Sequence, residues 1–202
     1  RIVPMLDYGY VVKRISQFLE EMLAKTNMNG YVIGLSGGID STTNLYLATK
    51  ALGKERVKAL IMPDSEVTPK EDIEDAISIA KILDVEYYLF DISEIIKSFS
   101  KTLPFFDANH NISIGNLRAR VRMVSLYYFA NRFNLLVIGT SNKSEILLGY
   151  FTKYGDGGAD VLPGPPALLA WGGGPLRPSA GPSLRASPLD WRDGVAPAGP
   201  AP

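Results

Sequence analysis

Gly34-Leu35-Ser36-Gly37-Gly38-Ile39-Asp40-Ser41 lies between an apolar run, Tyr31-Val32-Ile33, and a helical pattern, Thr42 to Leu52. This order predicts a strand, a tight glycine turn and the N-terminus of a helix. Because Gly37 and Gly38 carry no Cβ, backbone N–H groups there can approach phosphate oxygens closely. The first turn of the helix adds N–H groups without intrahelical partners and a partial positive charge. The stretch therefore predicts a phosphate site.

The side chains of the same stretch refine this prediction. Ser36 and Ser41 add hydroxyl donors, whereas Asp40 would repel a bare phosphate and so indicates a bound cation, in the first place Mg²⁺. The alternative is an ordinary turn in which the glycine pair permits the bend and Ser or Asp caps the helix. The full Ser-Gly-Gly-x-Asp-Ser string after an apolar strand favours the phosphate site. Neither the Walker A pattern nor the dinucleotide Gly-x-Gly-x-x-Gly pattern occurs.

Composition limits the classes of protein. The chain has 202 residues, enough for one domain with a sizeable core. Its formal net charge of +0 argues against a nucleic-acid partner held by phosphate contacts. The absence of cysteine excludes disulfides, thiolate zinc sites and a cysteine nucleophile. No apolar run is long enough to span a membrane and no secretory signal is recognisable, so we expect a cytoplasmic protein. Because the chain begins at Arg1, we also expect that N-terminal residues are missing.

The composition changes after Pro163. Residues 164–202 hold nine of the 14 prolines, and proline spaced this closely is incompatible with a helix or a central strand. We therefore predict a globular domain at 1–163, followed by an irregular Gly/Pro-rich and disordered tail at 164–202.

Within 1–163, strand patterns alternate with helical patterns. The predicted strands are 31–35, 57–62, 86–90 and 135–139, and the predicted helices are 10–23, 42–52, 68–83, 91–99 and 114–131. Thr68 is the predicted cap of the third helix. Such alternation predicts an α/β fold with a parallel twisted sheet and helices on both faces.

A second polar segment, Thr140 to Glu145, follows the fourth strand. Ligands of open parallel sheets bind beyond the carboxyl ends of the strands, where the strand order reverses. If strands one and four are neighbours, Thr140 could hydrogen-bond a nucleotide and Glu145 could share Mg²⁺ with Asp40. The alternative is a capping box, in which Ser141 or Asn142 pairs with Glu145.

Three further features are less specific. Arg118, Arg120 and Arg122 alternate along a predicted helix, which favours a solvated face with one functional member. Residues 151–160 form a polar, glycine-rich segment that could close over a ligand, with Lys153 and Asp160 as contacts. His110 is the only histidine, and we interpret it as an exposed loop residue rather than a general base.

Four segments together resemble NAD⁺ synthetase, a member of the ATP pyrophosphatase (PP-loop) group: 34–41, Gly-Asn-Leu-Arg-Ala-Arg-Val-Arg-Met at 115–123, Gly-Thr-Ser-Asn-Lys-Ser-Glu at 139–145, and Thr-Lys-Tyr-Gly-Asp-Gly-Gly-Ala-Asp at 152–160. The resemblance implies a Rossmann-like, adenine nucleotide alpha hydrolase-like fold. It implies that ATP is contacted by Gly34, Leu35, Ser36, Gly37, Gly38, Ile39, Asp40, Ser41 and Thr140. It implies that Mg²⁺ is bound by Asp40 and Glu145, and that deamido-NAD⁺ is contacted by Arg120, Lys153 and Asp160. The implied catalytic residues are Asp40 and Asp160.

The resemblance further implies a ligase that forms NAD⁺ from deamido-NAD⁺, ATP and ammonia through an acyl-adenylate, with release of AMP and pyrophosphate. It implies a cytoplasmic homodimer with a role in NAD biosynthesis. After Pro163 the family pattern stops, and Leu169 occupies the position of an ATP-contacting lysine. This change is typical of translation in a shifted reading frame, with a genuine disordered tail as the alternative. We expect ATP affinity with little or no NAD⁺ synthesis. The alternatives are another PP-loop enzyme, such as a tRNA-modifying or GMP-forming synthetase, and a non-catalytic ATP-binding remnant.

Overall fold

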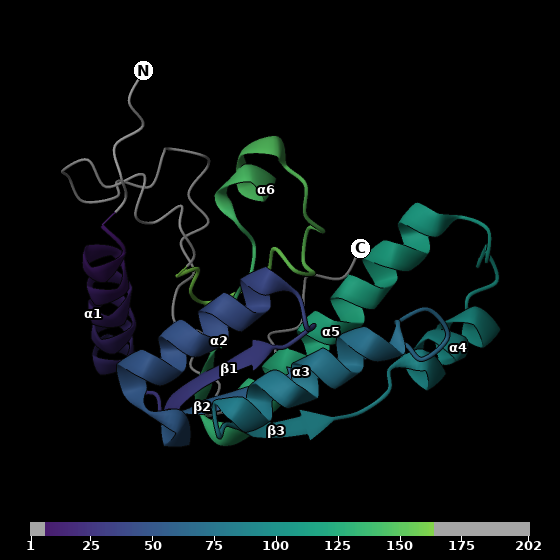
Figure 1. Cartoon of the computed structure of the whole chain (residues 1–202). Coiled ribbons are helices and arrows are strands. Elements are labelled where there is room, and N and C mark those ends of the chain that lie inside the picture. Colours follow the sequence, from purple (N-terminus) through teal and green to yellow (C-terminus); the bar gives the residue numbers. More distant parts are fainter. Residues whose placement is uncertain (1–6, 164–202) are drawn as a thin grey trace, which may run out of the picture. The chain divides into compact units, whose positions relative to one another are not determined.

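The structure is a computed structural model that describes residues 7–163. Predictions for 164–202, including the domain boundary after Pro163 and the role of Leu169, lie outside the described residues. The elements in chain order are α1 (Tyr8–Thr26), β1 (Gly30–Gly34), α2 (Ile39–Leu52), the short 3₁₀ helix η1 (Lys54–Arg56), β2 (Val57–Ile61), α3 (Lys70–Ile82), β3 (Glu86–Leu89), α4 (Ser93–Thr102), α5 (Asn111–Phe133), β4 (Leu135–Ile138) and α6 (Lys143–Leu148) (Figure 1).

The four strands form one parallel sheet in the order β3-β2-β1-β4. This confirms the predicted α/β architecture and makes β1 and β4 neighbours. Successive strands β1, β2 and β3 extend the sheet in one direction, whereas β4 is added on the opposite side of β1. The order therefore reverses between β1 and β4, where open parallel sheets bind their ligands.

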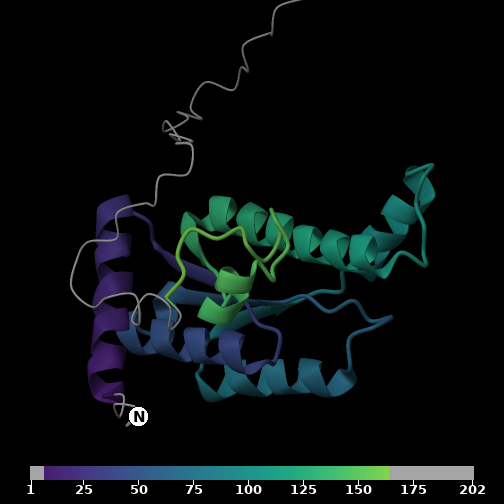
Figure 2. The ribbon, with the colours of Figure 1, turned by 90° about the horizontal axis from the view of Figure 1, so that it is seen from above.

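Helices cover both faces of the sheet because the strand residues alternate between two apolar clusters. Tyr31 and Ile33 point into a cluster shared with α1, α2 and α3. Val32 between them points into a second cluster, which includes Ile92, at the start of α4, and Val121 of α5. Figure 2 shows α1, α2 and α3 on one side of the sheet and α5 on the other. Both clusters are buried, which is why the strand sequences are almost continuously apolar.

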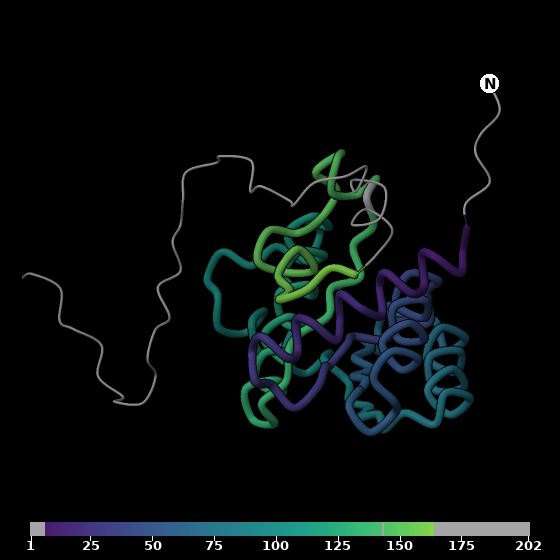
Figure 3. The backbone as a smooth tube through the Cα atoms, turned by 90° about the vertical axis from the view of Figure 1, so that its left-hand side faces the viewer, coloured from purple at the N-terminus to yellow at the C-terminus, as the bar shows by residue number. Residues whose placement is uncertain are grey.

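Helix α1 packs on the outside of this layer and crosses the domain diagonally in Figure 3. Its buried residues Ile15, Leu19 and Leu23 follow helical spacing. The hydroxyl of Tyr31 in β1 donates a hydrogen bond to the carbonyl oxygen of Leu19 over 2.8 Å, so α1 is joined to the central strand by a buried polar contact.

This contact predicts a pH dependence of stability. Burial, and then the charge of Asp160, raises the pKa of Tyr31 to about 12. An unfolded tyrosine ionises near pH 10, so the stabilisation is complete below that pH and is lost as the pH rises toward about 12. In urea unfolding, Tyr31→Phe should lose less stability than the wild type over this interval, whereas the exposed control Tyr46→Phe should follow the wild type. Equal losses in Tyr31→Phe and the wild type would contradict the assignment.

The turn after β2 is held by charged contacts from the opposite layer. Asp64 is 1% exposed and accepts a hydrogen bond from the Nε of Arg118 over 2.6 Å. Hydrogen bonds from Ser65, and then from Ser93, lower the pKa of Asp91 to about 2.

Thr68 does not cap α3 as predicted, because its hydroxyl accepts the N–H of Asp64 within this turn. The N-cap position belongs to Pro69.

Beyond β4 the chain returns to the sheet at Val161. Val161 forms a parallel β-bridge with Ile138. The N–H of Gly139 donates a hydrogen bond to the carbonyl oxygen of Val161 over 2.9 Å. The segment that precedes it is thereby held at the carboxyl end of β4. Within residues 7–163, no helix is both long and apolar enough to cross a membrane.

Candidate functional site

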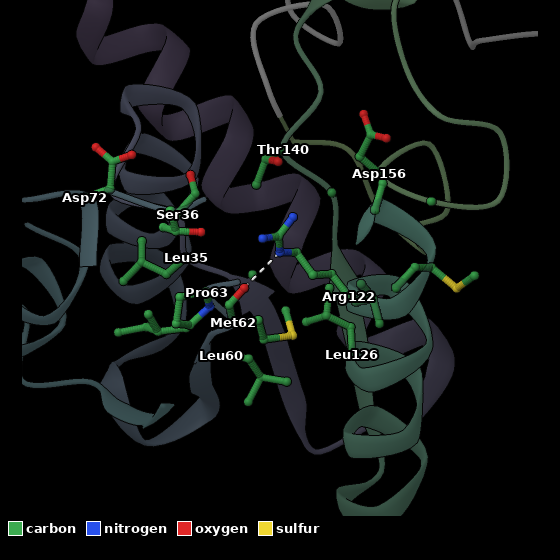
Figure 4. A pocket seen from close by; sticks show the side chains of 18 of the residues that line it. Leu35, Ser36, Leu60, Met62, Pro63, Asp72, Arg122, Leu126, Thr140 and Asp156 are labelled. Carbon is green, nitrogen blue, oxygen red and sulfur yellow. Dashed lines mark hydrogen bonds between the residues drawn. The ribbon is translucent and has the colours of Figure 1, made fainter. Parts of the chain in front are cut away.

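A cavity of about 530 Å³ opens at the carboxyl ends of β1, β2 and β4. Gly34, Leu35 and Ser36 contribute from β1 and the turn after it, and Thr140 contributes from the segment after β4. The start of each predicted loop therefore lines one crevice, whereas residues 37–41 and 141–145 do not line it. Side chains from the end of β2, from α3 and from α5 complete the walls. They include Leu60, Met62, Arg122 and Leu126 (Figure 4), together with Ile73 and Met123.

The turn between β1 and α2 is fixed by its serine hydroxyls. The hydroxyl of Ser41 donates to the carbonyl oxygen of Gly38 over 3.0 Å and lies 3.1 Å from the hydroxyl of Ser36. It also accepts the N–H of Ser36 over 3.3 Å. Because Ser41 is 3% exposed and committed to these contacts, it braces the turn in this conformation instead of offering the free hydroxyl donor that the sequence suggested. Ser36 remains at the surface of the turn.

Gly37 is required by the geometry of the turn. Its φ is +85°, a conformation that L side chains rarely adopt. A Cβ at this position would lie 2.5 Å from the carbonyl oxygen of Asp72 in the first turn of α3. The turn therefore packs backbone against backbone on α3. No side chain caps α2, whose N-cap is Gly38, so the capping alternative does not explain the Ser-Gly-Gly string.

The segment after β4 contains the capping box that the sequence offered as the alternative to a metal ligand. The N–H of Glu145 donates to the side chain of Asn142 over 3.0 Å, and the N–H of Asn142 donates to Oε2 of Glu145 over 2.8 Å. Asn142, and not Ser141, is the N-cap of α6. One carboxylate oxygen of Glu145 is thus used within the protein.

Asp40 lies in the first turn of α2, and its carboxylate forms no hydrogen bond or ion pair with any residue between 7 and 163. In this part of the chain no three His, Asp or Glu side chains cluster as a metal site. Asp40 and Glu145 do not line the cavity, whereas Asp72 and Asp156 do. Asp40 and one carboxylate oxygen of Glu145 have no partner within residues 7–163. Carboxylates in this small number, completed by phosphate oxygens, have the chemistry that suits Mg²⁺.

The three arginines of α5 divide as helical geometry predicts, with Arg118 and Arg122 on one face and Arg120 on another. The predicted solvated face is wrong for two of them. Arg118 pairs with the buried Asp64, and Arg122 donates from its Nε to the carbonyl oxygen of Met62 over 2.9 Å. Arg120 is exposed and donates from its Nε to the carbonyl oxygen of Lys153 over 3.2 Å.

Residues 151–160 pack along α5. The hydroxyl of Thr152 donates to the side chain of Asn116 over 2.7 Å. Lys153 is exposed, with its Nζ 4.9 Å from the ring centre of Tyr154. Asp160 accepts the N–H of Val137 over 2.7 Å and the hydroxyl of Tyr127 over 3.0 Å. Both of its carboxylate oxygens therefore join this segment to β4 and α5.

Asp160 also affects Tyr127 electrostatically. Burial, and then the charge of Asp160 and its hydrogen bond, raises the pKa of Tyr127 above its ordinary value. At neutral pH the tyrosine therefore remains a hydrogen-bond donor to the carboxylate. None of the three residues predicted to contact the second substrate lines the cavity: Arg120, Lys153 and Asp160. Arg120 and Lys153 are in contact with each other.

His110 is exposed, as predicted, but it has a structural task. It is the N-cap of α5, where its Nδ1 accepts the N–H of Ser113 over 3.3 Å and lies 2.8 Å from the hydroxyl of the same residue. The helix thus begins earlier than position 114, where the apolar pattern places it.

Arg122 and the end of β2 also form part of the cavity wall, which was not predicted from the sequence. One signal was present: β2 ends at the same edge of the sheet as β1, so the residues after it lie beside the predicted site. Nothing in the local pattern distinguishes Arg122 from Arg120, because the direction of each side chain depends on how α5 packs on the sheet.

Comparison with known proteins places these features in one family. A family model described as NAD synthase matches residues 11–165. The NH(3)-dependent NAD(+) synthetase of Staphylothermus marinus is 54% identical over 158 residues, which are 78% of this chain and 57% of that protein. The chain therefore spans little more than half the length of this curated relative.

Two solved structures share the fold. The NH3-dependent NAD synthetase from Campylobacter jejuni superposes with a TM-score of 0.73 at 40% identity, covering 79% of this chain and 67% of that one. The NMN synthetase from Francisella tularensis superposes with a TM-score of 0.73 at 35% identity, covering 79% of this chain and 65% of that one.

Proposed function

This chain belongs to the NAD synthase family, and we propose that it binds ATP and serves the ammonia-dependent amidation of deamido-NAD⁺ to NAD⁺. The observation that carries the proposal is that Ser36 and Thr140, from two loops far apart in sequence, line one cavity where the strand order reverses. Membership of this family also sets aside the tRNA-modifying and GMP-forming alternatives.

The geometry supports ATP at the 34–41 loop. The first N–H groups of α2 have no side-chain cap, so they can donate to phosphate oxygens. The cavity beside the loop has apolar walls that include Leu60, Ile73 and Leu126, which suit a nucleoside. Ile39 and Asp40 begin the helix whose N-terminus holds the phosphates, and Thr140 offers a hydroxyl from the other side.

The proposed reaction has two steps. A carboxylate oxygen of the nicotinate ring bonds to the α-phosphorus of ATP, and the bond from that phosphorus to the bridging oxygen breaks with its electron pair on pyrophosphate. Ammonia then attacks the acyl carbon of the acyl-adenylate, and AMP leaves with the electron pair of the acyl–oxygen bond as a proton is lost from nitrogen. No covalent nucleophile of the protein is needed. The chain's part is to align the substrates and offset negative charge.

Mg²⁺ belongs to this proposal, with Asp40 and Glu145 as its protein ligands. Bound there, the ion would supply positive charge to the phosphates. The capping box orients Glu145 through one oxygen and leaves the other for the metal. Asp40 is also proposed as a catalytic residue, because it is a proposed ligand of this ion.

The second substrate is assigned to Arg120, Lys153 and Asp160. Their support is chemical: two cations on adjacent segments suit the diphosphate of deamido-NAD⁺, and Asp160 lies at the end of β4, at the edge of the sheet that carries the cavity. Asp160 is also proposed as a catalytic residue, with its contact to Tyr127 holding it in place. We further propose a cytoplasmic location and a homodimer, which the exposed apolar side chains Ile112, Val124 and Tyr128 on α5 support.

Product identity tests the proposal directly. The 202-residue chain would be incubated with ATP, Mg²⁺ and ammonia, with and without deamido-NAD⁺, and the nucleotides separated. We expect AMP and NAD⁺ that appear only with deamido-NAD⁺, at rates below about 1 s⁻¹. Formation of ADP, or of AMP regardless of deamido-NAD⁺, would contradict it. ATP binding without any AMP would favour the non-catalytic remnant.

The metal assignment predicts a selective effect of one substitution. In the wild type, Mg²⁺ should raise the affinity for ATP, and Asp40→Asn should remove most of that increase because the carboxylate is replaced by a weaker neutral ligand. Titration calorimetry with and without Mg²⁺ measures the increase. Glu74→Gln, an exposed acidic residue on α3, is the control and should behave as the wild type. An undiminished Mg²⁺ effect in Asp40→Asn would rule out this ligand.

A further inference from the structure

Arg122 is the only arginine or lysine among the residues that line the cavity in the part of the chain the structure describes. It reaches the cavity from α5, partly buried, with its Nε held by the carbonyl oxygen of Met62. In Figure 4 its guanidinium group extends from α5 toward the centre of the site, between Thr140 and the turn at Leu35 and Ser36. The hydrogen bond to Met62 fixes this direction.

The guanidinium group has no anionic partner among residues 7–163. The nearby carboxylate of Asp64 forms its ion pair with Arg118. Asp72 and Asp156 also line the cavity, but both are exposed and neither forms an ion pair with Arg122. Burial, and then the neighbouring charge of Arg118, lowers the pKa of Arg122, with Asp64 opposing the shift. The bond from Nε to Met62 uses one of the five donors of the guanidinium group, and the other four are available to an anion in the cavity.

The surroundings indicate which anion this is. The cavity that Arg122 enters has apolar walls at Leu60, Met123 and Leu126, and the turn proposed to bind phosphate lines it at Ser36. A nucleotide placed with its nucleoside against the walls and its terminal phosphates on the turn has its α-phosphate between the two. The guanidinium group points to that junction.

We propose that Arg122 binds the α-phosphate of the nucleotide and holds the AMP moiety during acyl transfer. This rests on the proposed function, because it assumes ATP in the cavity. The planar guanidinium group can donate two parallel hydrogen bonds to one phosphate. When the substrate carboxylate bonds to the α-phosphorus and pyrophosphate leaves, the same contacts persist to the adenylate and then to AMP. Arg122 is thus a binding residue for the part of ATP that remains after pyrophosphate has gone.

The test compares ligands that carry three phosphates, one phosphate or none. Titration calorimetry of the full chain with ATP, AMP and adenosine would use wild type, Arg122→Met and Arg122→Lys. Arg122→Met should weaken AMP and ATP binding at least about tenfold and leave adenosine binding unchanged. Arg122→Lys should recover part of the loss, since it keeps the charge without the planar fork. Arg132→Met, on the exposed end of the same helix, is the matched control and should bind all three ligands as the wild type does.

Each outcome bears on a definite claim. Equal AMP affinity in wild type and Arg122→Met overturns the inference and leaves the proposed function standing. A folded wild type that binds neither ATP nor AMP overturns both. If Arg122→Met fails to fold, NMR of the wild type with isotope-labelled arginine tests whether Arg122 contacts the phosphate. AMP should then shift one guanidinium signal that Arg122→Lys lacks, and adenosine should not. An unshifted signal overturns the inference.

Discussion

Gly37→Ala should reduce the affinity of the chain for ATP by about 10- to 100-fold. The added methyl group would lie 2.5 Å from the carbonyl oxygen of Asp72, so the turn or the start of α3 must move. Movement of the turn displaces the N–H groups that are proposed to bind the phosphates, and hydrogen bonds to charged groups contribute about 1.5–3 kcal/mol each. Titration calorimetry with ATP and Mg²⁺ measures the loss.

Gly53→Ala separates this effect from backbone strain. Gly53 also has a positive φ, +82°, but a Cβ there would meet nothing within 4 Å, and the residue lies at the far end of α2. This variant should lose stability because of the strained conformation and keep its ATP affinity. If Gly37→Ala binds ATP as tightly as Gly53→Ala, the turn does not hold the phosphates.

Arg118→Met should lower the free energy of unfolding by about 3 kcal/mol. The substitution keeps much of the apolar length of the side chain but leaves Asp64, which is 1% exposed, without its cation. The remaining contact of that carboxylate is one N–H, from Glu66 at 3.3 Å. Urea unfolding followed by circular dichroism measures the change.

The control for this prediction is Lys97→Met. Lys97 pairs with Glu66 and Glu94, but its side chain is 42% exposed and its ion pairs are screened by solvent, so its loss should cost much less than the loss of Arg118. Adding Asp64→Asn to Arg118→Met should recover part of the lost stability, because a neutral amide is less costly to bury than an unpaired carboxylate. Equal losses in Arg118→Met and Lys97→Met would show that the buried pair has no special weight.

The elements of the fold were predictable because their signals are local. The apolar strands and the amphipathic pattern of α1 depend on neighbours along the chain, and both appear where expected within a few residues. The parallel sheet followed from the alternation of elements. Details set by tertiary contacts were not predictable: Thr68 bonds within the turn instead of capping α3, and His110 caps a helix that the apolar pattern begins later.

The site divides in the same way. The sequence could place Ser36 and Thr140 at one cavity because each follows a strand, and parallel strands end at one edge of the sheet. The arginines of α5 could not be ranked, because their roles depend on Asp64 and the carbonyl oxygen of Met62, which are more than 50 residues away. Likewise, the commitment of Ser41 to the carbonyl oxygen of Gly38 depends on the folded turn, which its position in the string does not reveal.

Calorimetric titration of the 202-residue chain with ATP and Mg²⁺ tests the central claim most directly. The site described here predicts one nucleotide per chain, with a dissociation constant between about 1 μM and 1 mM, the usual range of substrate concentrations at half-maximal rate. Pyrophosphate should compete for the site, because it would occupy the same turn. Absence of binding by the folded chain, or binding that pyrophosphate does not affect, would contradict the account.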